Sequence, residues 1–152
     1  MRISDEQLIL IMNEVVRRFL VPKFLELGMN ATGEWLDSLE TTASNQTAFI
    51  RGRDYTRYLA NGRQPGKRPP IEPLQRWAAA KFGLDPQQAR GAAFGIANKI
   101  AREGTTWHQR GGSDLVEVLN SPECIQFIQE QLTSIMTIEA RQEIQQFIND
   151  EF

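Results

Sequence analysis

Apolar residues at the start of the chain recur at steps of 4, 3 and 4: Leu8, Met12, Val15 and Phe19. This period places them on one face of a helix. Ser4 and Gln7 have the spacing of a capping box, a motif that begins helices. The pattern predicts an N-terminal amphipathic helix over residues 4–27, kinked or ended by Pro22 and closed by Gly28.

After Gly33 the helical period is lost and strand-forming residues become frequent. Three apolar residues lead into a threonine-rich stretch: Trp35, Leu36 and Leu39. A polar turn at Ala43-Ser44-Asn45 then separates this stretch from a second apolar run at 47–50. The pattern predicts an antiparallel β-hairpin over residues 34–51. Because two strands are marginally stable alone, we expect the hairpin to pack on helices or to join a neighbour's sheet.

Residues 54–70 combine a short helix with a turn-rich segment. Asp54 is placed to cap the helix, and we expect Gly62 to end it with a positive φ. The face of this helix holds Tyr55, Tyr58 and Leu59. Three prolines and a glycine then fall within seven residues, Gln64-Pro65-Gly66-Lys67-Arg68-Pro69-Pro70. This composition predicts a stiff, exposed loop, because proline interrupts both helices and central strands.

A further helix is predicted over residues 71–82, ending at Gly83. Its apolar face consists of Ile71, Leu74, Trp77, Ala78 and Phe82. Since Trp77 and Leu74 are large members of this face, we expect them to anchor the core against the first or the last helix.

The next helix is predicted over residues 86–103. Asp85 supplies a cap residue, a proline takes the first helical position, and Gly104 ends the helix. Its face is small, formed by Ala89, Ala93, Ile96 and Ile100, with Gly91 and Gly95 alongside. So few bulky groups allow another helix to approach closely.

A long acidic helix is predicted over residues 121–150. It begins with Ser121-Pro122, again a cap residue followed by a proline. Its apolar stripe consists of Ile125, Ile128, Leu132 and Ile135, extended by Ile144, Phe147 and Ile148. No internal repeat or low-complexity linker divides the chain. We therefore predict a single mainly helical α+β domain over residues 1–152, with one small β-hairpin and a long C-terminal helix.

Composition narrows the class of protein. The chain has 152 residues, of which 41% are hydrophobic and 24% charged, which is typical of a globular domain. One cysteine, Cys124, excludes a disulfide scaffold. No apolar run has the length of a membrane span, and the N-terminus lacks the order of a signal peptide, so we expect a cytosolic origin.

The modest net charge of −2 conceals an uneven distribution. Residues 1–50 hold 4 Lys and Arg against 7 Asp and Glu, residues 51–110 hold 12 against 4, and residues 111–152 hold 1 against 8. A basic middle suits nucleic acid. It equally suits acidic surface on the same chain or on a neighbouring subunit, and the sequence pI near 5.5 favours this second interpretation.

Candidate catalytic and metal-binding groups are few. His108 is the only histidine, without cysteines or clustered carboxylates at metal-ligand spacing, and we interpret it as a partly exposed loop residue. Cys124 is interpreted as a small buried residue, although a fold that brought His108 near it would permit nucleophilic chemistry. Gly-rich phosphate loops and Gly-x-Ser-x-Gly motifs are absent from the sequence. We predict that the protein is no enzyme and has no catalytic residue, cofactor or metal.

Two tyrosines lie among basic residues near the middle of the chain. Tyr55 and Tyr58 are surrounded in sequence by Arg51, Arg53, Arg57 and Arg63. Aromatic rings among arginines suit stacking on nucleic-acid bases. The helical spacing favours a different interpretation, in which the tyrosines pack inward and the arginines stay solvated or meet acidic neighbours.

Three sequence features carry a resemblance to a known family. They are Tyr55-Thr-Arg-Tyr58-Leu59-Ala-Asn-Gly62-Arg63-Gln-Pro65-Gly66-Lys67-Arg68-Pro69-Pro70, a helix that holds Trp77, and Ile100-Ala-Arg-Glu-Gly104-Thr105. Together they resemble the minor virion proteins of tailed bacteriophages, in particular the neck, head-tail joining or tail-completion family. The order of elements agrees with that family, whereas the long acidic C-terminal helix departs from its shorter members and leaves the subfamily open.

The resemblance implies a structural virion protein, part of a ring in the neck or head-tail connector or a protein that completes the tail. The implied partners are further copies of the chain, virion proteins on the portal or adaptor side and on the tail side, and genomic DNA passing without sequence-specific binding; no membrane is implied. The protein would lie in the virion after assembly in the host bacterial cytoplasm. The assembly residues implied are Tyr55, Tyr58, Gly62, Arg63, Pro65, Gly66, Lys67, Arg68, Pro69, Pro70, Trp77 and Gly104. The alternative is a nucleic-acid-binding accessory protein that uses the basic region 51–110.

Overall fold

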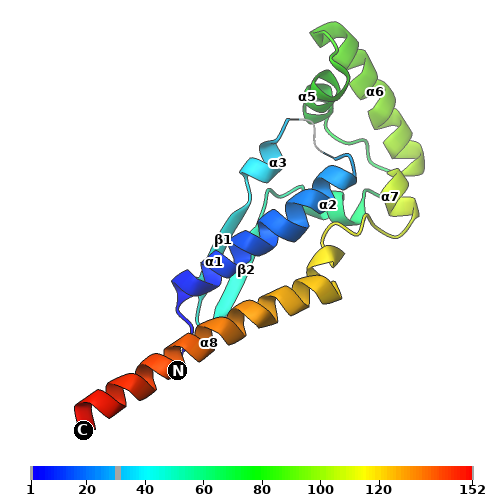
Figure 1. The fold of residues 1–152 in the computed structure, drawn as a ribbon. Coiled ribbons are helices and arrows are strands. Elements are labelled where there is room, and N and C mark those ends of the chain that lie inside the picture. The colour runs from blue at the N-terminus through cyan, green and yellow to red at the C-terminus, as the bar shows by residue number, and fades with distance from the viewer. Residues whose placement is uncertain (1, 30–31, 152) are drawn as a thin grey trace. The chain divides into compact units, whose positions relative to one another are not determined.

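A computed structural model describes residues 2–29 and 32–151 (Figure 1). The fold is α+β and mostly helical, with one two-stranded antiparallel hairpin and a long C-terminal helix, which confirms the predicted class. Backbone contacts gather into two compact units, each assembled from separate stretches of chain. The first unit comprises Met1–Val21, Glu40–Arg51 and Glu117–Phe152, and the second comprises Pro22–Leu39 and Gly52–Val116. Within the described ranges, no helix is both long enough and apolar enough to cross a membrane.

The N-terminal helical segment begins as predicted. Helix α1 (Asp5–Val15) is preceded by Ser4, whose side chain accepts from the backbone of Gln7 while the Gln7 side chain accepts in return. A π-helical turn (Val16–Leu20) and helix α2 (Val21–Glu26) follow. Pro22 therefore lies inside the helical segment, and the wider π turn comes just before this residue, which has no N–H to donate.

The hairpin is shorter than predicted. Strand β1 (Glu40–Ser44) pairs with strand β2 (Thr47–Arg51), so the turn consists of Asn45 and Gln46. Both turn residues have positive φ, 52° and 61°, as a two-residue hairpin turn with the twist of its strands requires. The predicted turn at 43–45 was one residue early, because side-chain type alone does not set the strand register.

The start of the predicted hairpin, residues 34–37, is helical instead of extended. Helix α3 (Glu34–Asp37) follows Gly33, whose φ of 78° lies in the left-handed region. This turn buries Trp35, and the Trp35 ring lies 4.6 Å from the Phe24 ring between centroids. Burial of the indole explains why the helical turn prevails over the strand preference of an aromatic residue.

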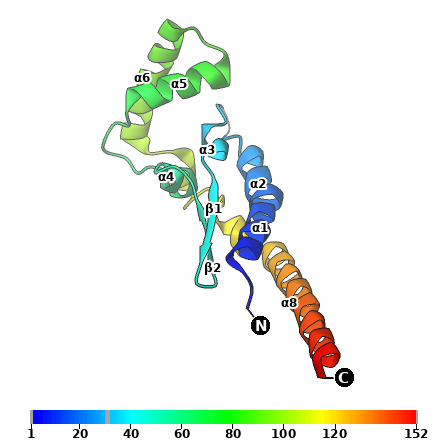
Figure 2. The ribbon, with the colours of Figure 1, turned by 90° about the vertical axis from the view of Figure 1, so that its left-hand side faces the viewer.

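The core of the first unit lies between α1, the hairpin and helix α8 (Pro122–Glu151). Strands β1 and β2 both lie beside α1 (Figure 2). Ile11, Val15 and Cys124 are buried at the centre, with Phe19 and Phe127 in ring contact at 5.8 Å. A 3₁₀ turn (Glu117–Asn120) precedes α8, and the Ser121 hydroxyl caps that helix by accepting from the Cys124 amide. The predicted burial of the cysteine is confirmed.

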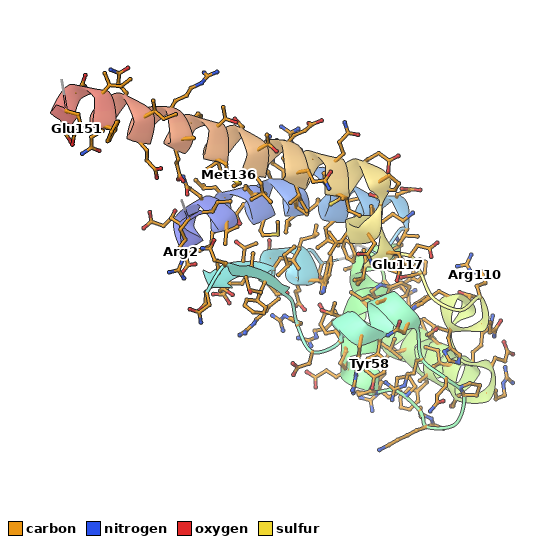
Figure 3. The ribbon with its side chains drawn as sticks, turned by 90° about the horizontal axis from the view of Figure 1, so that it is seen from below. Arg2, Tyr58, Arg110, Glu117, Met136 and Glu151 are labelled. Atoms are coloured by element: carbon orange, nitrogen blue, oxygen red, sulfur yellow. The ribbon has the colours of Figure 1, made fainter. Side chains whose placement is uncertain are left out.

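The final stretch of α8 is the main departure from the predicted packing. Ile144, Phe147 and Ile148 are exposed by 60%, 63% and 45%, so they do not extend the core stripe as predicted. Ile144 lies nine residues after Ile135, which is about two and a half helical turns and therefore the opposite side of the helix. Figure 3 shows α8 running past Arg2 to Glu151, beyond the elements that cover its first half.

The second unit holds helices α4 (Thr56–Asn61), α5 (Ile71–Phe82), α6 (Pro86–Glu103) and α7 (Thr106–Gln109). The bounds predicted for α5 and α6 are confirmed, including the Asp85 cap, which forms a capping box with Gln88. Asp54 was the wrong cap for α4, because Tyr55 occupies that position and its side chain makes no capping bond. Helix α7 was not predicted.

Helices α5 and α6 pack on one another through alanines. The fully buried small residues are Ala78, Ala89, Ala93 and Ala97. Added Cβ atoms on Gly91 and Gly95 would meet nothing within 4 Å, so these glycines lie away from the close contact they were predicted to border. Trp77 and Leu74, which were predicted to anchor the core against the first or the last helix, are both half-buried. They belong to the second unit and lie outside the core between α1, the hairpin and α8.

Candidate functional site

The residues of the sequence motif converge in the second unit. We call residues 58–66 and 101–113 the clasp, because backbone and side-chain hydrogen bonds join these two segments at both ends. Arg63 exchanges two bonds with Thr105, one from the Arg63 amide to the Thr105 hydroxyl and one from the Thr105 amide to the Arg63 carbonyl, both 2.9 Å. The Gly66 amide donates to the Ala101 carbonyl at 2.8 Å.

The other end of the clasp is joined by an indole and a serine. Trp107 donates from Nε1 to the Tyr58 carbonyl at 2.7 Å. The Ser113 amide donates to the Ala60 carbonyl at 2.8 Å, and its hydroxyl donates to the Leu59 carbonyl. The two Ser113 bonds give partners to carbonyls in the last turn of α4, and the Tyr58 carbonyl also accepts from the Gly62 amide at 2.9 Å.

Two glycines allow the segments of the clasp to approach. A Cβ atom on Gly62 would meet the Thr105 hydroxyl at 2.5 Å and the His108 amide nitrogen at 2.6 Å, and one on Gly104 would meet the Arg63 carbonyl at 2.8 Å. Both glycines also have positive φ, 77° and 75°. The predicted positive φ of Gly62 is therefore confirmed, and close backbone contact is a second reason why these positions suit glycine.

A basic cup opens beside the clasp. It has a volume of about 420 Å³, and its lining residues are Arg57, Tyr58, Asn61, Gly62, Arg63, Gln64, Pro65, Lys67 and His108. Two guanidinium groups lie close to the Tyr58 ring, with the Arg57 Cζ 4.8 Å and the Arg63 Cζ 5.0 Å from its centroid. No carboxylate is among the lining residues in the part of the chain that the structure describes. The cup therefore suits an anion, such as a phosphate or a carboxylate.

A larger apolar groove lies within the same unit. It has a volume of about 890 Å³ and is lined largely by aromatic, aliphatic and proline side chains. Among them are Phe24, Leu27, Trp35, Tyr55, Leu74, Trp77, Ile96, Ile100 and Trp107. Tyr55 is in a partly desolvated place, and burial raises the pKa of its phenol. A groove of this size and character suits an apolar ligand or an amphipathic helix.

Ten of the twelve predicted assembly residues line at least one of these two hollows, and two of the ten, Tyr58 and Arg63, line both. Gly62, Pro65 and Lys67 line the basic cup. The residues that line the apolar groove are Tyr55, Pro69, Pro70, Trp77 and Gly104. Gly66 and Arg68 line neither hollow, and Arg68 is exposed. The proline loop is exposed as predicted, except that Pro69 is buried.

The sequence prediction missed Thr105, Trp107 and Ser113 as residues that build the site. Thr105 caps α7 by accepting from the His108 amide, so its hydroxyl serves both the helix and the clasp. The signal was present in the sequence, since a threonine directly after a helix-ending glycine is a candidate cap for a new helix.

The two reactive side chains lie in different units. His108 is exposed on α7, where a loop was predicted, and Cys124 is buried in the core of the first unit. Burial raises the pKa of the Cys124 thiol, which disfavours the nucleophilic thiolate. Over the ranges 2–29 and 32–151, no cluster of three or more His, Cys, Asp or Glu side chains is arranged to hold a metal ion.

No protein-family model, no curated protein sequence and no solved structure matches this chain at a significant level.

Proposed function

We propose that this chain is a structural protein of a tailed-bacteriophage virion. In this proposal it forms part of a ring in the neck or head-tail connector, or completes the tail, and so joins head and tail around the DNA channel. The resemblance of the Tyr55–Thr105 stretch to that family supports the proposal. Residues of this stretch also form most of the clasp. Its glycines allow the two segments to approach, Thr105 bonds to Arg63 across them, and residues of the clasp line both the basic cup and the apolar groove.

The observation that carries the proposal is the exposed end of α8. Every residue from 141 to 150 is exposed, and three of them are the large apolar residues Ile144, Phe147 and Ile148. A contiguous exposed apolar surface of this kind marks an interaction site. We call residues 141–151 the C-terminal arm. A subunit that binds several neighbours needs exposed apolar surface for those contacts, whereas an enzyme that acts as a monomer does not.

Ring assembly also accounts for the uneven charge of the chain. A ring forms through contacts between two unlike surfaces, repeated around an axis. Opposite charges on those surfaces select the correct orientation, although exposed ion pairs add only about 0–1 kcal/mol each. Residues 51–110 supply the basic surface, and residues 111–152, with 8 acidic against 1 basic side chain, supply the acidic one. Apolar contacts then provide most of the affinity.

The proposed partners are further copies of the chain, virion proteins on the portal or adaptor side and on the tail side, and DNA that passes through the ring lumen. Contacts of these kinds need no chemical step, so we propose no enzymatic activity. The protein would be found in the virion, after assembly in the cytoplasm of the bacterial host.

Analysis of particles tests this proposal. Virions of the phage that encodes the chain are purified and examined by mass spectrometry, and a labelled antibody locates the protein by electron microscopy. We expect the protein in stoichiometric amount at the head-tail junction or tail end. Deletion of the gene is expected to give separate heads and tails, or unfinished tails, and the wild-type gene in trans restores joining. Absence of the protein from purified particles would contradict the proposal.

The basic cup favours one second candidate, a nucleic-acid-binding accessory protein. Arg57, Arg63 and Lys67 line the cup and could contact phosphates. This function predicts binding of labelled duplex DNA with an affinity that falls steeply as salt rises. The matched variant is Lys67→Glu, which reverses one charge of the cup. Negligible binding of the wild-type chain at low salt would eliminate this candidate and leave the structural proposal in place.

A further inference from the structure

The C-terminal arm has the anchor pattern of a helix that binds in a groove. Ile144, Phe147 and Ile148 are spaced i, i+3 and i+4, so their side chains lie together on one face of α8. This face is turned away from the stripe that packs on α1, and all three side chains are 45% exposed or more. Amphipathic helices recognise apolar grooves through this spacing.

The apolar groove of the second unit offers a surface of matching character. The N–H groups of two of its tryptophans already have partners: Trp35 Nε1 donates to the Thr56 hydroxyl at 2.8 Å, and Trp107 Nε1 donates to the Tyr58 carbonyl. No buried side-chain nitrogen or oxygen within residues 2–29 and 32–151 lacks a hydrogen-bond partner. The groove therefore presents mainly apolar surface to a ligand, and a volume of about 890 Å³ accommodates several large side chains.

The charged residues around the apolar groove indicate what kind of helix it can bind. Five cationic residues line the groove, and the only carboxylate among its described lining residues is that of Glu34. The cationic residues are Arg53, Arg63, Arg76, Lys99 and Arg110. The C-terminal arm carries three acidic residues, Glu143, Asp150 and Glu151, against Arg141. An apolar helix with acidic flanks therefore complements an apolar groove with basic flanks.

We propose that the C-terminal arm of one copy docks in the apolar groove of a second copy, with Ile144, Phe147 and Ile148 as the buried anchors. The inference rests on the proposed ring function and names the contact that would build the ring. Because the arm and the groove are unlike surfaces, the contact is heterologous, and each copy can give one arm and receive another. This arrangement closes into a ring when the rotation per subunit permits.

Site-specific photo-crosslinking in the full chain tests the contact. A photoreactive phenylalanine replaces Phe147, and this chain is mixed with unmodified chain labelled with ¹⁵N. We expect crosslinks from position 147 to labelled peptides of the groove, within residues 69–77 or 96–107. The matched control places the photoreactive residue at Gln146, which is exposed on another side of the same helical turn, and should give few crosslinks. Crosslinks confined to one chain, or to labelled peptides outside the groove, would overturn the inference.

Two variants test the contact by complementation. Phe147→Asp alters the exposed arm, and Leu74→Asp places a charge in the groove. By sedimentation velocity we expect the wild-type chain to self-associate as concentration rises, and each variant alone to stay monomeric. An equal mixture should form a dimer and nothing larger, since only one intact arm and one intact groove remain. Because Leu74 is half-buried, circular dichroism first establishes that its variant folds. If it does not, Pro73→Asp replaces it, which puts a charge at an exposed apolar position of the groove.

The outcomes separate this inference from the proposed function. If the protein is found at the head-tail junction but position 147 never reaches the groove of another copy, the docking contact is wrong and the virion function stands. If the crosslinks form but the protein is absent from particles, the chain assembles through this contact in another setting. Variants that self-associate like the wild-type chain would also overturn the docking contact.

Discussion

A Cβ atom on Gly62 would lie 2.5 Å from the Oγ1 atom of Thr105, nearer than Cβ atoms approach non-bonded heavy atoms in real proteins. The same hydroxyl oxygen accepts from the Arg63 amide at 2.9 Å and caps α7. A side chain at position 62 would therefore displace a group that serves both segments of the clasp. It would also have to adopt a φ of 77°, which costs an L-residue free energy even without a clash.

We expect Gly62→Ala to lower the free energy of unfolding by about 2–4 kcal/mol, because backbone strain and overpacking add. Chemical denaturation followed by circular dichroism measures the change. The matched control is Gly83→Ala, since Gly83 has a φ of 63° and an added Cβ there meets nothing within 4 Å. This variant should cost only about 1–2 kcal/mol from the backbone alone. Equal costs at the two positions would mean that the clasp relaxes around a methyl group.

Sequence patterns predicted the elements that have strong local signals. Helices α5 and α6 have their predicted bounds because Gly83 ends α5, whereas Asp85 caps the start of α6 and Gly104 ends it. Helices α3 and α7 have four residues each, too few for a hydrophobic period, and tertiary contacts of Trp35 and Thr105 hold them in place. Their existence depends on residues distant in sequence, which local patterns do not register.

The sequence predicted which residues belong to the candidate site but not how they are arranged in space. Tyr58, Arg63 and Trp77 were singled out, and all three line a hollow. The reason for their placement, the exchange of bonds between Arg63 and Thr105, joins residues 42 positions apart and leaves no local signal. The stripe of α8 was extended too far for a different reason. Ile144 lies nine residues after Ile135, on the opposite side of the helix, so the helical period itself separates it from the buried face.

Two tryptophans of the second unit should differ in their contribution to stability. Trp35 is 3% exposed and packs on Phe24, so we expect Trp35→Ala to cost about 3–5 kcal/mol. Trp77 is half-buried, with its ring at 5.5 Å from the exposed Phe82, so Trp77→Ala should cost about half as much. Thermal and denaturant unfolding of both variants measure the difference. A Trp77 variant as unstable as the Trp35 variant would mean that Trp77 is a core residue and not a groove residue.

The Glu14 carboxylate should titrate far below its usual range. Hydrogen bonds from Arg17 at 2.7 Å and from Arg18 at 3.1 Å lower the pKa of Glu14 from 4.5 to about 2. Because the pKa is lower in the folded protein, these bonds stabilise the fold above pH 4.5, and this contribution is lost as the pH falls toward 2. NMR titration of the side-chain carboxyl carbon measures the midpoint. It should rise toward 4.5 in Arg17→Ala/Arg18→Ala, whereas an ordinary midpoint in the wild-type chain would contradict the bonds.

The Cys124 thiol should be unreactive in the folded protein. It is fully buried in the core of the first unit, and burial raises its pKa. Modification by a thiol reagent then requires unfolding, so we expect it to be slowed by on the order of a thousandfold or more relative to the denatured chain. Ser134→Cys provides the control, because residue 134 is exposed on the same helix and its thiol should react at once. Rapid labelling of Cys124 in the native wild-type chain would show that the core opens readily.

The basic surface of the proline loop should decide incorporation into particles without deciding whether the subunit folds. Lys67 and Arg68 are exposed, whereas Arg63 packs over the Tyr58 ring at 5.0 Å and bonds to Thr105, so Arg63 contributes to the fold as well as to the charge. Reversal of Lys67 and Arg68 to glutamate leaves the clasp intact and places negative charge where an acidic neighbour is proposed to approach, which opposes association. We expect Lys67→Glu/Arg68→Glu to be folded by circular dichroism but strongly depleted from purified virions by mass spectrometry.

Arg90→Glu/Arg102→Glu changes the net charge equally, at two exposed positions of α6, and should be incorporated normally. Normal incorporation of both double variants would place the loop outside every essential contact, and equal depletion of both would mean that net charge, not this surface, controls assembly.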